Sequence, residues 1–399
     1  MSLKKKAKSS LLWTVLESVF VKSFTFIVTL ALTRLLSPED FGLIGLITVF
    51  VALGNVIVES GMGTSIIRDS KSNDVDYSTV FYANLLISIV LYILVYFAAP
   101  YIAAFFETAL LVDLIRVYSI SFIIAAFFNI QQNLLMKELA FKKLTILTLP
   151  GVIIGSLTGL VMAYLGYGVW SIVALHISTQ TIKAFVIWIK SDWRPKWVFS
   201  TEKLKYHINF GYKLMFSSVL NTMFNELYTV IIGKNFSVTA LGYYSQARVF
   251  KNYPVQFTTS ILSKVSYPLL SKIKEDKEKI SFVYQSILKT VFFCITFLMF
   301  GLATIAKPLF LVLFSEKWIE AAPYFQILAI SSILTPIHTF NIDVFKVFGR
   351  TDLFLKLEFV KITLVLISVF IGLYFGIQGL LWSIVISSYL ALLINTHYS

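Results

Sequence analysis

The sequence predicts an all-α, polytopic membrane protein of about twelve transmembrane helices arranged in two six-helix lobes. Hydrophobic residues make up 57% of the 399 residues and charged residues only 14%, which lies well outside the range of soluble domains. The apolar runs are long enough for membrane-spanning helices and too long for the ten-residue alternating strands of an outer-membrane barrel. In addition, residues 232–250 repeat the layout of residues 32–50. The repeat predicts that the chain contains one unit twice.

The transmembrane spans follow from apolar runs of roughly 20 residues or more. We expect them at residues 10–36, 41–66, 79–104, 112–136, 145–165, 168–190, 208–233, 238–262, 281–305, 322–348, 353–375 and 378–396. In the fifth span, Gly151, Gly155 and Gly159 recur every fourth residue, a spacing that favours close packing against a neighbouring helix.

The repeated segment is a hairpin between two spans. Residues 32–50 read LTRLLSPEDFGLIGLITVF, and in residues 232–250 Ser237 stands for Ser37, Leu241-Gly242 for Phe41-Gly42, and Phe250 for Phe50. The ends of the halves also match, since YLGYGVWSIV at 164–173 corresponds to YFGIQGLLWSIV at 374–385. An even number of helices per unit predicts lobes related by an axis along the membrane normal, with a cavity between them. We expect the lobes at 1–190 and 208–399, joined by a cytoplasmic linker at 191–207.

The orientation follows from the basic residues. With the N-terminus in the cytoplasm, most Lys and Arg residues fall in cytoplasmic segments, and the outer loops keep Arg34, Lys234, Lys307 and Lys317. The positive-inside rule therefore predicts a cytoplasmic N-terminus. The basic start MSLKKKAK lacks a cleavage site after its apolar segment, so we expect a retained tail rather than a signal peptide.

Several functional classes are disfavoured. The net charge of +13 lies mostly in loops and forms no basic helix face of the kind that follows nucleic-acid phosphates, so no nucleic acid is expected. The single cysteine, Cys294, gives no disulfide framework or metal cluster. No phosphate-binding loop, paired metal-spaced histidines or nucleophile elbow occurs. We therefore expect neither an enzyme nor a cofactor or metal.

Charged and polar residues inside the spans are the candidate site, because a charge at a helix centre costs roughly 2.5–3.5 kcal/mol on insertion scales. Phosphate groups are expected to bind the cations, with amide and hydroxyl groups beside them. These substrate-binding candidates are Lys22, Lys213, Arg248, Lys251, Asn55, Asn225 and Tyr244. The ion-coupling candidates, for H⁺ or Na⁺, are Glu17, Glu59 and Glu226.

The spacing of these residues groups them into stripes. Asn55 and Glu59 lie one turn apart, and Tyr244, Arg248 and Lys251 fall at i, i+4 and i+7. The four helices of the two hairpins carry all the candidates, so we expect their stripes to meet across the central cavity. The alternative interpretation is that some of these groups snorkel to the membrane surface or form structural ion pairs.

Three stretches resemble a known family. They are LTRLLSPEDFGLIGL at 32–46, NIQQNLLMKELAF at 129–141 and GYGVWSIV at 166–173. The chain resembles the Wzx-type polysaccharide exporters, also called O-antigen or lipid-linked oligosaccharide flippases, of the multidrug/oligosaccharidyl-lipid/polysaccharide (MOP) superfamily. The RLLSPEDFG string is the most specific part of this resemblance.

The resemblance implies a MATE-like fold and a carrier in the bacterial inner membrane. Such carriers move undecaprenyl-pyrophosphate-linked oligosaccharide repeats from the cytoplasmic to the outer leaflet for the synthesis of O-antigen, capsule or exopolysaccharide. Lys22, Arg248 and Lys251 are implied by position as ligands of the pyrophosphate. Membrane lipids, a polysaccharide polymerase and chain-length proteins are the further partners implied.

Three alternatives stay open at this point. A cation-coupled multidrug or metabolite antiporter of the same superfamily would show acids without a cationic stripe, which Arg248 and Lys251 contradict. A lipid II flippase also needs a basic cavity, so the residues do not separate it. A membrane enzyme or scaffold of polymer assembly is disfavoured by the short loops and by the repeat.

Overall fold

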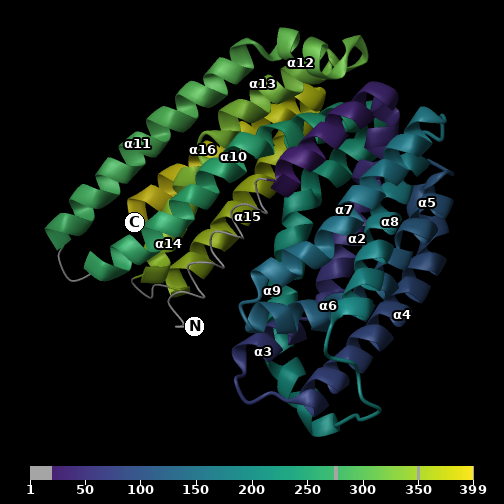
Figure 1. The fold of residues 1–399 in the computed structure, drawn as a ribbon. Helices are drawn as coiled ribbons and strands as arrows, with labels where there is room; N and C mark the ends of the chain where they lie inside the picture. The colour runs from purple at the N-terminus through teal and green to yellow at the C-terminus, as the bar shows by residue number, and fades with distance from the viewer. Residues whose placement is uncertain (1–19, 274–276, 348–350, 399) are drawn as a thin grey trace. The chain divides into compact units, whose positions relative to one another are not determined.

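Helices account for all the regular structure in the described part of the chain, residues 20–273, 277–347 and 351–398 of a computed structural model (Figure 1). This confirms the all-α, polytopic fold class. The contacts divide the chain into two compact units, residues 1–239 and 240–399. Helix α9 packs on α2, α3 and α4 and so belongs to the first unit, whereas counting six helices per lobe assigns it to the second. The lobe boundaries stay a prediction.

The first described residues of the first unit, 20–35, are helical. Its further helices are α2 (Pro38–Glu59), α3 (Met62–Arg68), α4 (Asp74–Phe105), α5 (Leu111–Tyr118), α6 (Ile120–Lys137), α7 (Phe141–Tyr164), α8 (Trp170–Lys190) and α9 (Thr201–Asn235). The second unit contains α10 (Val238–Ile273), α11 (Lys277–Thr304), α12 (Ala306–Phe314), a 3₁₀ turn at Glu316–Trp318, α13 (Ala321–Ser332), α14 (Thr335–Val347), α15 (Thr351–Tyr374) and α16 (Gly376–Tyr398).

Within the described residues, each predicted span coincides with a helix or a pair of helices, and three spans are interrupted. The predicted span 41–66 breaks after Glu59, where Ser60 and Gly61 adopt left-handed backbone angles, with φ of 50° and 66°. The spans 112–136 and 322–348 are likewise split into α5 with α6 and α13 with α14. The short helix α12 was not predicted. Apolar patterns detect such breaks poorly, because the residues on both sides stay hydrophobic.

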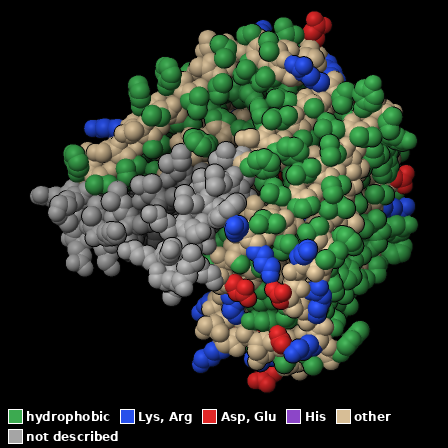
Figure 2. All heavy atoms as spheres, in the orientation of Figure 1, with side chains coloured by type: hydrophobic (Ala, Val, Ile, Leu, Met, Phe, Trp, Pro, Cys, Tyr) green, Lys and Arg blue, Asp and Glu red, His purple; other side chains and the backbone are tan. Residues whose placement is uncertain are grey.

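Seven helical segments among the described residues are long and apolar enough to cross a membrane by length and composition. The chain is thus a multi-pass membrane protein. Helices α9 and α10 do not meet that criterion, because they carry the polar residues expected to line the cavity. In Figure 2, hydrophobic side chains cover the flank of the first unit, and charged side chains gather at its lower end.

The two hairpins have the same local structure. Two residues separate the end of helix 20–35 from the start of α2 at Pro38, and two residues separate the end of α9 at Asn235 from the start of α10 at Val238. Ser37 caps α2: its hydroxyl accepts from the Asp40 backbone N–H while the Asp40 carboxylate accepts from the Ser37 N–H at 2.9 Å. Such a capping box fixes a helix start from sequence alone. The helix break falls at the corresponding place in both hairpins, next to Ser37 and Ser237; the duplication of the whole unit stays a prediction.

The matching ends of the halves also have a shared cause. Gly166 follows α7 with φ of 85°, and Gly376 opens α16 with φ of 69°. Side chains rarely adopt this left-handed region, so glycine is favoured at both turns. In both halves the left-handed glycine comes two residues after the end of the preceding helix, at Tyr164 or Tyr374. The connection itself is longer in the first half, where α8 begins at Trp170, than in the second, where α16 begins at Gly376.

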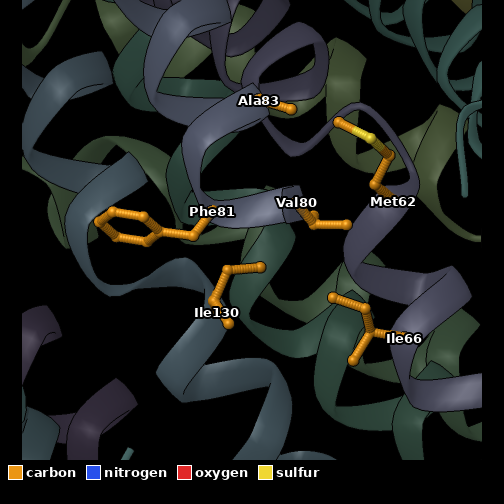
Figure 3. Packing of buried hydrophobic residues seen from close by; sticks show 6 residues of the cluster. All are labelled: Met62, Ile66, Val80, Phe81, Ala83 and Ile130. Atoms are coloured by element: carbon orange, nitrogen blue, oxygen red, sulfur yellow. The ribbon is translucent and has the colours of Figure 1, made fainter. Parts of the chain in front are cut away.

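The core of the first unit that positions the site joins α3, α4 and α6 (Figure 3). Met62 and Ile66 from α3 pack against Val80 from α4 and Ile130 from α6, and all four are fully buried. A second tight contact joins α7 and α8, where Gly155 lies against the backbone of Leu175 and Thr179. The close packing predicted from the glycine spacing is confirmed.

Candidate functional site

The predicted candidates in the first unit lie on helix 20–35, α2 and α9. Lys22 is exposed on its helix, Asn55 is partly buried, and Glu59 is exposed at the last position of α2. Ser60, the next residue, donates a hydrogen bond to Asn84 Oδ1 of α4 at 3.0 Å. Glu17 lies outside the described residues. Glu59 is thus placed at a break between α2 and α3, where the helix path changes direction.

Helix α9 carries three candidates along its length. Lys213 is exposed two residues after Gly211, which approaches the backbone of Ser60 and Gly61. Asn225 donates a side-chain hydrogen bond to Asn221 Oδ1 at 3.1 Å, and Thr229 donates to Glu226 Oε2 at 2.9 Å. The Glu226 carboxylate therefore keeps a hydroxyl donor from its own helix.

The predicted cationic stripe lies on one uninterrupted helix of the second unit. Because α10 is continuous from Val238 to Ile273, the spacing of Tyr244, Arg248 and Lys251 puts them on one face. Tyr244 is buried, and both cations are partly buried. On the same helix, Phe250 packs against Phe310, Phe314 and Phe325 at centroid distances of 5.3–5.6 Å. These contacts anchor α10 on α12 and α13. The meeting of this stripe with the polar residues of α2 and α9 stays a prediction.

Lys183 of α8 is a membrane-embedded cation that the comparison of the two hairpins does not single out. Its Nζ lies 4.5 Å from the centroid of the Phe128 ring. It interacts electrostatically with Glu59 and with His176. His176 stacks on Tyr118 at 4.3 Å, and its Nε2 is buried with no hydrogen-bond partner in the described part of the chain. The available signal in the sequence was a lysine in the interior of the predicted span 168–190, whose other lysine, Lys190, stands at its end.

A buried polar network at one end of the first unit joins residues that are far apart in the sequence. His207 of α9 hydrogen-bonds Ser65 Oγ of α3 through Nδ1 at 2.8 Å and Asp76 Oδ1 of α4 through Nε2 at 3.1 Å. Lys203 Nζ also reaches Asp76 Oδ1, at 3.2 Å. His207 and the Asp76 side chain are fully buried. Buried polar groups of this kind need such partners, so the network positions α9 against α3 and α4.

The linker after α8 is held by the same end of the unit. The backbone N–H groups of Lys196 and Ser200 donate to Ser78 Oγ at 3.0 Å and Thr79 Oγ1 at 3.1 Å. The Lys143 ammonium, 2.6 Å from Asp192, holds the pKa of that carboxyl below its ordinary value through a hydrogen bond. Residues 201–207 of the predicted linker form the first two turns of α9.

At a separate point in the first unit, Lys234 near the end of α9 contacts the loop after α4. Its Nζ donates to Glu107 Oε1 at 2.8 Å, and this hydrogen bond lowers the pKa of the Glu107 carboxyl. Glu107 has a left-handed φ of 55°. The contact ties the loop after α4 to the second hairpin.

The sequence profile of the family described as "Polysaccharide biosynthesis protein" matches residues 31–323. The succinoglycan biosynthesis transport protein ExoT of Rhizobium meliloti is 26% identical, over 82% of this chain and 67% of its own length. The teichuronic acid biosynthesis protein TuaB of Bacillus subtilis is 24% identical, over 88% and 73%. The lipopolysaccharide biosynthesis protein WzxC of Escherichia coli is 22% identical, over 93% and 76%.

Solved structures with a similar fold are membrane transporters. The lipid II flippase MurJ in an inward closed conformation matches with a TM-score of 0.76 and 19% identity, over 96% of this chain and 87% of MurJ. An inward-facing multidrug resistance MATE family transporter of the MOP superfamily matches with a TM-score of 0.69 and 19% identity, over 93% and 92%. At these identities the likeness shows the fold, which is of the MATE and MurJ type.

Proposed function

This chain belongs to the family of polysaccharide biosynthesis proteins, and we propose that it is a flippase for lipid-linked oligosaccharides. It moves a repeat unit joined by pyrophosphate to undecaprenol from the cytoplasmic to the outer leaflet of the bacterial inner membrane by alternating access. The repeat serves the assembly of a surface polysaccharide such as O-antigen, capsule or exopolysaccharide. The protein catalyses no covalent step and has its N-terminus in the cytoplasm.

The observation that carries this proposal is the family match over residues 31–323, which includes both hairpins. Relatives that match 82–93% of this chain are named for the biosynthesis or transport of succinoglycan, teichuronic acid and lipopolysaccharide. The relatives share a role in polysaccharide biosynthesis and differ in the polymer, so their names support a polysaccharide carrier and favour no single sugar.

The stripe on α10 supplies the chemistry for the pyrophosphate. Arg248 and Lys251 stand one turn apart on one face, and a guanidinium with an ammonium beside it suits two adjoining phosphates. Tyr244, one turn before Arg248, adds a hydroxyl group. Lys22 and Lys213 provide further positive charge on the helices of the first unit, and Asn55 and Asn225 provide amide groups.

The test is complementation of a strain that lacks the gene for this protein. Arg248→Ala and Lys251→Ala are expected to lower surface-polysaccharide export at least about tenfold each, because a charge-assisted hydrogen bond is worth roughly 1.5–3 kcal/mol. Lipid-linked repeats should accumulate in the cells. Lys289→Ala is the matched control, because Lys289 is exposed on α11, away from the stripe. Full export by both stripe variants would refute the phosphate-binding role.

The same experiments separate the alternatives. If the protein is a lipid II flippase, its expression should restore growth of cells depleted of their own lipid II flippase. Deletion of its gene should then leave surface polysaccharide unchanged. A multidrug or metabolite antiporter would change drug tolerance without accumulation of lipid-linked sugars. Accumulation of lipid-linked repeats in the deletion strain would favour the oligosaccharide over both.

We further propose that Glu59 binds the coupling cation, H⁺ or Na⁺, with Glu17 and Glu226 as the other acids of the pathway. Glu59 lies at the break after α2 and interacts electrostatically with Lys183. A cation bound to the Glu59 carboxylate would neutralise its negative charge and so weaken its attraction to Lys183. Glu59→Gln should make transport insensitive to proton and sodium gradients, whereas Glu202→Gln, exposed at the start of α9, should not. Unchanged gradient dependence in Glu59→Gln would exclude this role.

A further inference from the structure

A polar pocket lies in the first unit between the end of α3 and the first half of α9. It has a volume of about 510 Å³, within the range of small-molecule sites. Helix α3 and the loop after it contribute Arg68, Ser70 and Lys71, and α9 contributes Tyr206 and Asn209. All are exposed. None of these residues belongs to the stripes that were predicted to bind substrate.

The floor of this pocket is held by buried hydrogen bonds. It includes Ser65, which is 4% exposed and bound to the buried His207, itself held by Asp76. Beside the floor, the Arg68 guanidinium lies 4.7 Å from the centroid of the Phe210 ring. Stacking on an aromatic ring engages the face of a guanidinium and leaves its N–H edges available for an acceptor.

The two cations of the pocket differ from two neighbouring lysines that form ion pairs. At this end of the unit, Lys196 pairs with Asp74 at 2.6 Å and Lys203 with Asp76 at 3.2 Å. Among the described residues, no ion pair within 4 Å engages Arg68 or Lys71. The single acid of the pocket, Asp69, accepts the Lys71 backbone N–H with Oδ1 at 2.9 Å. The pocket therefore combines an excess of positive charge with neutral donors.

The surroundings suit a ligand presented at a membrane surface. Tyr206 in the pocket wall is 56% exposed, and on the linker Trp197 is 95% exposed and stacks on Tyr82 of α4. Exposed tyrosine and tryptophan side chains are typical of the headgroup level of a bilayer. The phosphoryl groups of lipids lie at that level.

We propose that this pocket binds the phosphoryl headgroup of a lipid through Arg68 and Lys71, with Ser70, Tyr206 and Asn209 as neutral donors. The chemistry is shared by anionic phospholipids and by a polyprenyl diphosphate. The assignment to a phosphoryl group stands without the proposed function, and only the polyprenyl diphosphate as its source rests on it. In that case the pocket is a site of first capture, separate from the stripe on α10.

The test measures binding to the purified full-length protein in detergent by native mass spectrometry, with inorganic pyrophosphate, phosphatidylglycerol and undecaprenyl diphosphate as probes. The variants are Arg68→Gln/Lys71→Gln, Phe210→Leu and the control Lys205→Gln, which removes an exposed lysine of α9 outside the pocket. All are also made in the Arg248→Ala/Lys251→Ala background, so that binding at the stripe does not mask the pocket. Thermal unfolding without ligand checks that each variant is folded.

Affinity for at least one lipid probe should fall at least tenfold in Arg68→Gln/Lys71→Gln, fall less in Phe210→Leu and stay unchanged in Lys205→Gln. Loss confined to undecaprenyl diphosphate and pyrophosphate identifies the carrier lipid, and loss confined to phosphatidylglycerol identifies a membrane-lipid site. Equal binding of every probe by the double variant and the wild-type protein overturns the proposal. If the stripe variants export normally while the pocket variants lose binding, the phosphate role of α10 fails and the pocket stands.

Discussion

Single buried residues decide how the helix ends of the first unit are held. Asp76 accepts hydrogen bonds from both His207 and Lys203, and its side chain has no exposed surface. Asp74, two residues earlier on the same helix, pairs with Lys196 at 2.6 Å, but its side chain is 44% exposed. Water screens the second pair and leaves the first largely unscreened, so the two acids should differ in their contribution to stability.

Asp76→Asn should therefore lower the free energy of unfolding by about 1–3 kcal/mol, because it weakens a buried acceptor on which His207 and Lys203 depend. Asp74→Asn, the matched control, should change it by no more than about 1 kcal/mol. Thermal unfolding in detergent, followed by circular dichroism, gives the comparison. Equal shifts for the two variants would show that the buried network adds nothing to stability beyond a surface pair.

At the scale of elements, glycine sets how closely two helices approach. A Cβ atom on Gly155 of α7 would lie 2.8 Å from both the Leu175 carbonyl oxygen and the Thr179 nitrogen of α8. On Gly301 of α11 it would meet no atom within 4 Å among the described residues. The same substitution should therefore have opposite effects at these two helical positions.

Gly155→Ala should destabilise the protein by about 1–3 kcal/mol through overpacking. Gly301→Ala should stabilise it by about 0.5–1 kcal/mol, because alanine costs less backbone entropy in a helix. The measurement is the unfolding midpoint of each variant in the same detergent. A destabilised Gly301→Ala, or a neutral Gly155→Ala, would contradict the packing of α7 on α8 as the cause.

At the scale of the whole molecule, the proposed orientation assigns each loop to one side of the membrane. Ser70, after α3, belongs to the expected cytoplasmic side, and Glu316, after α12, to the outer side; both are exposed. Lys137, in the same end of the unit as Ser70, donates to the Asp69 carbonyl at 2.8 Å. The basic residues expected inside thus gather around one end of the first unit.

A cysteine-labelling experiment checks this orientation. In a Cys294→Ser background, a membrane-impermeant maleimide should label Glu316→Cys in intact spheroplasts, and Ser70→Cys only after permeabilisation. Because the reagent does not cross the membrane, labelling shows on which side of the membrane each cysteine lies. The reverse labelling pattern would place the N-terminus outside the cell. It would contradict the proposed orientation.

The helices and the two hairpins were predictable because their signals are local. Apolar runs, the Ser37 capping box and the left-handed glycines Gly166 and Gly376 act over a few neighbouring residues, so they can be read without the fold. The breaks at Ser60 and Ser119 were missed because apolar residues resume within two positions of each break, at Met62 and Ile120. The stripe of Arg248 and Lys251 was predictable for the same reason as the helices, since one continuous helix sets its spacing.

By itself, then, the sequence determined the class of protein, its duplicated hairpins and the family to which it belongs, since composition and local motifs carry that information. The tertiary structure alone decided which distant residues meet. His207 hydrogen-bonds Ser65, which lies 142 positions earlier in the sequence. Lys183 of α8 interacts electrostatically with Glu59 of α2. The pocket of Arg68 and Lys71 exists only because α9 packs on α3. Such contacts depend on how helices pack, and packing is set by side chains that are far apart along the chain.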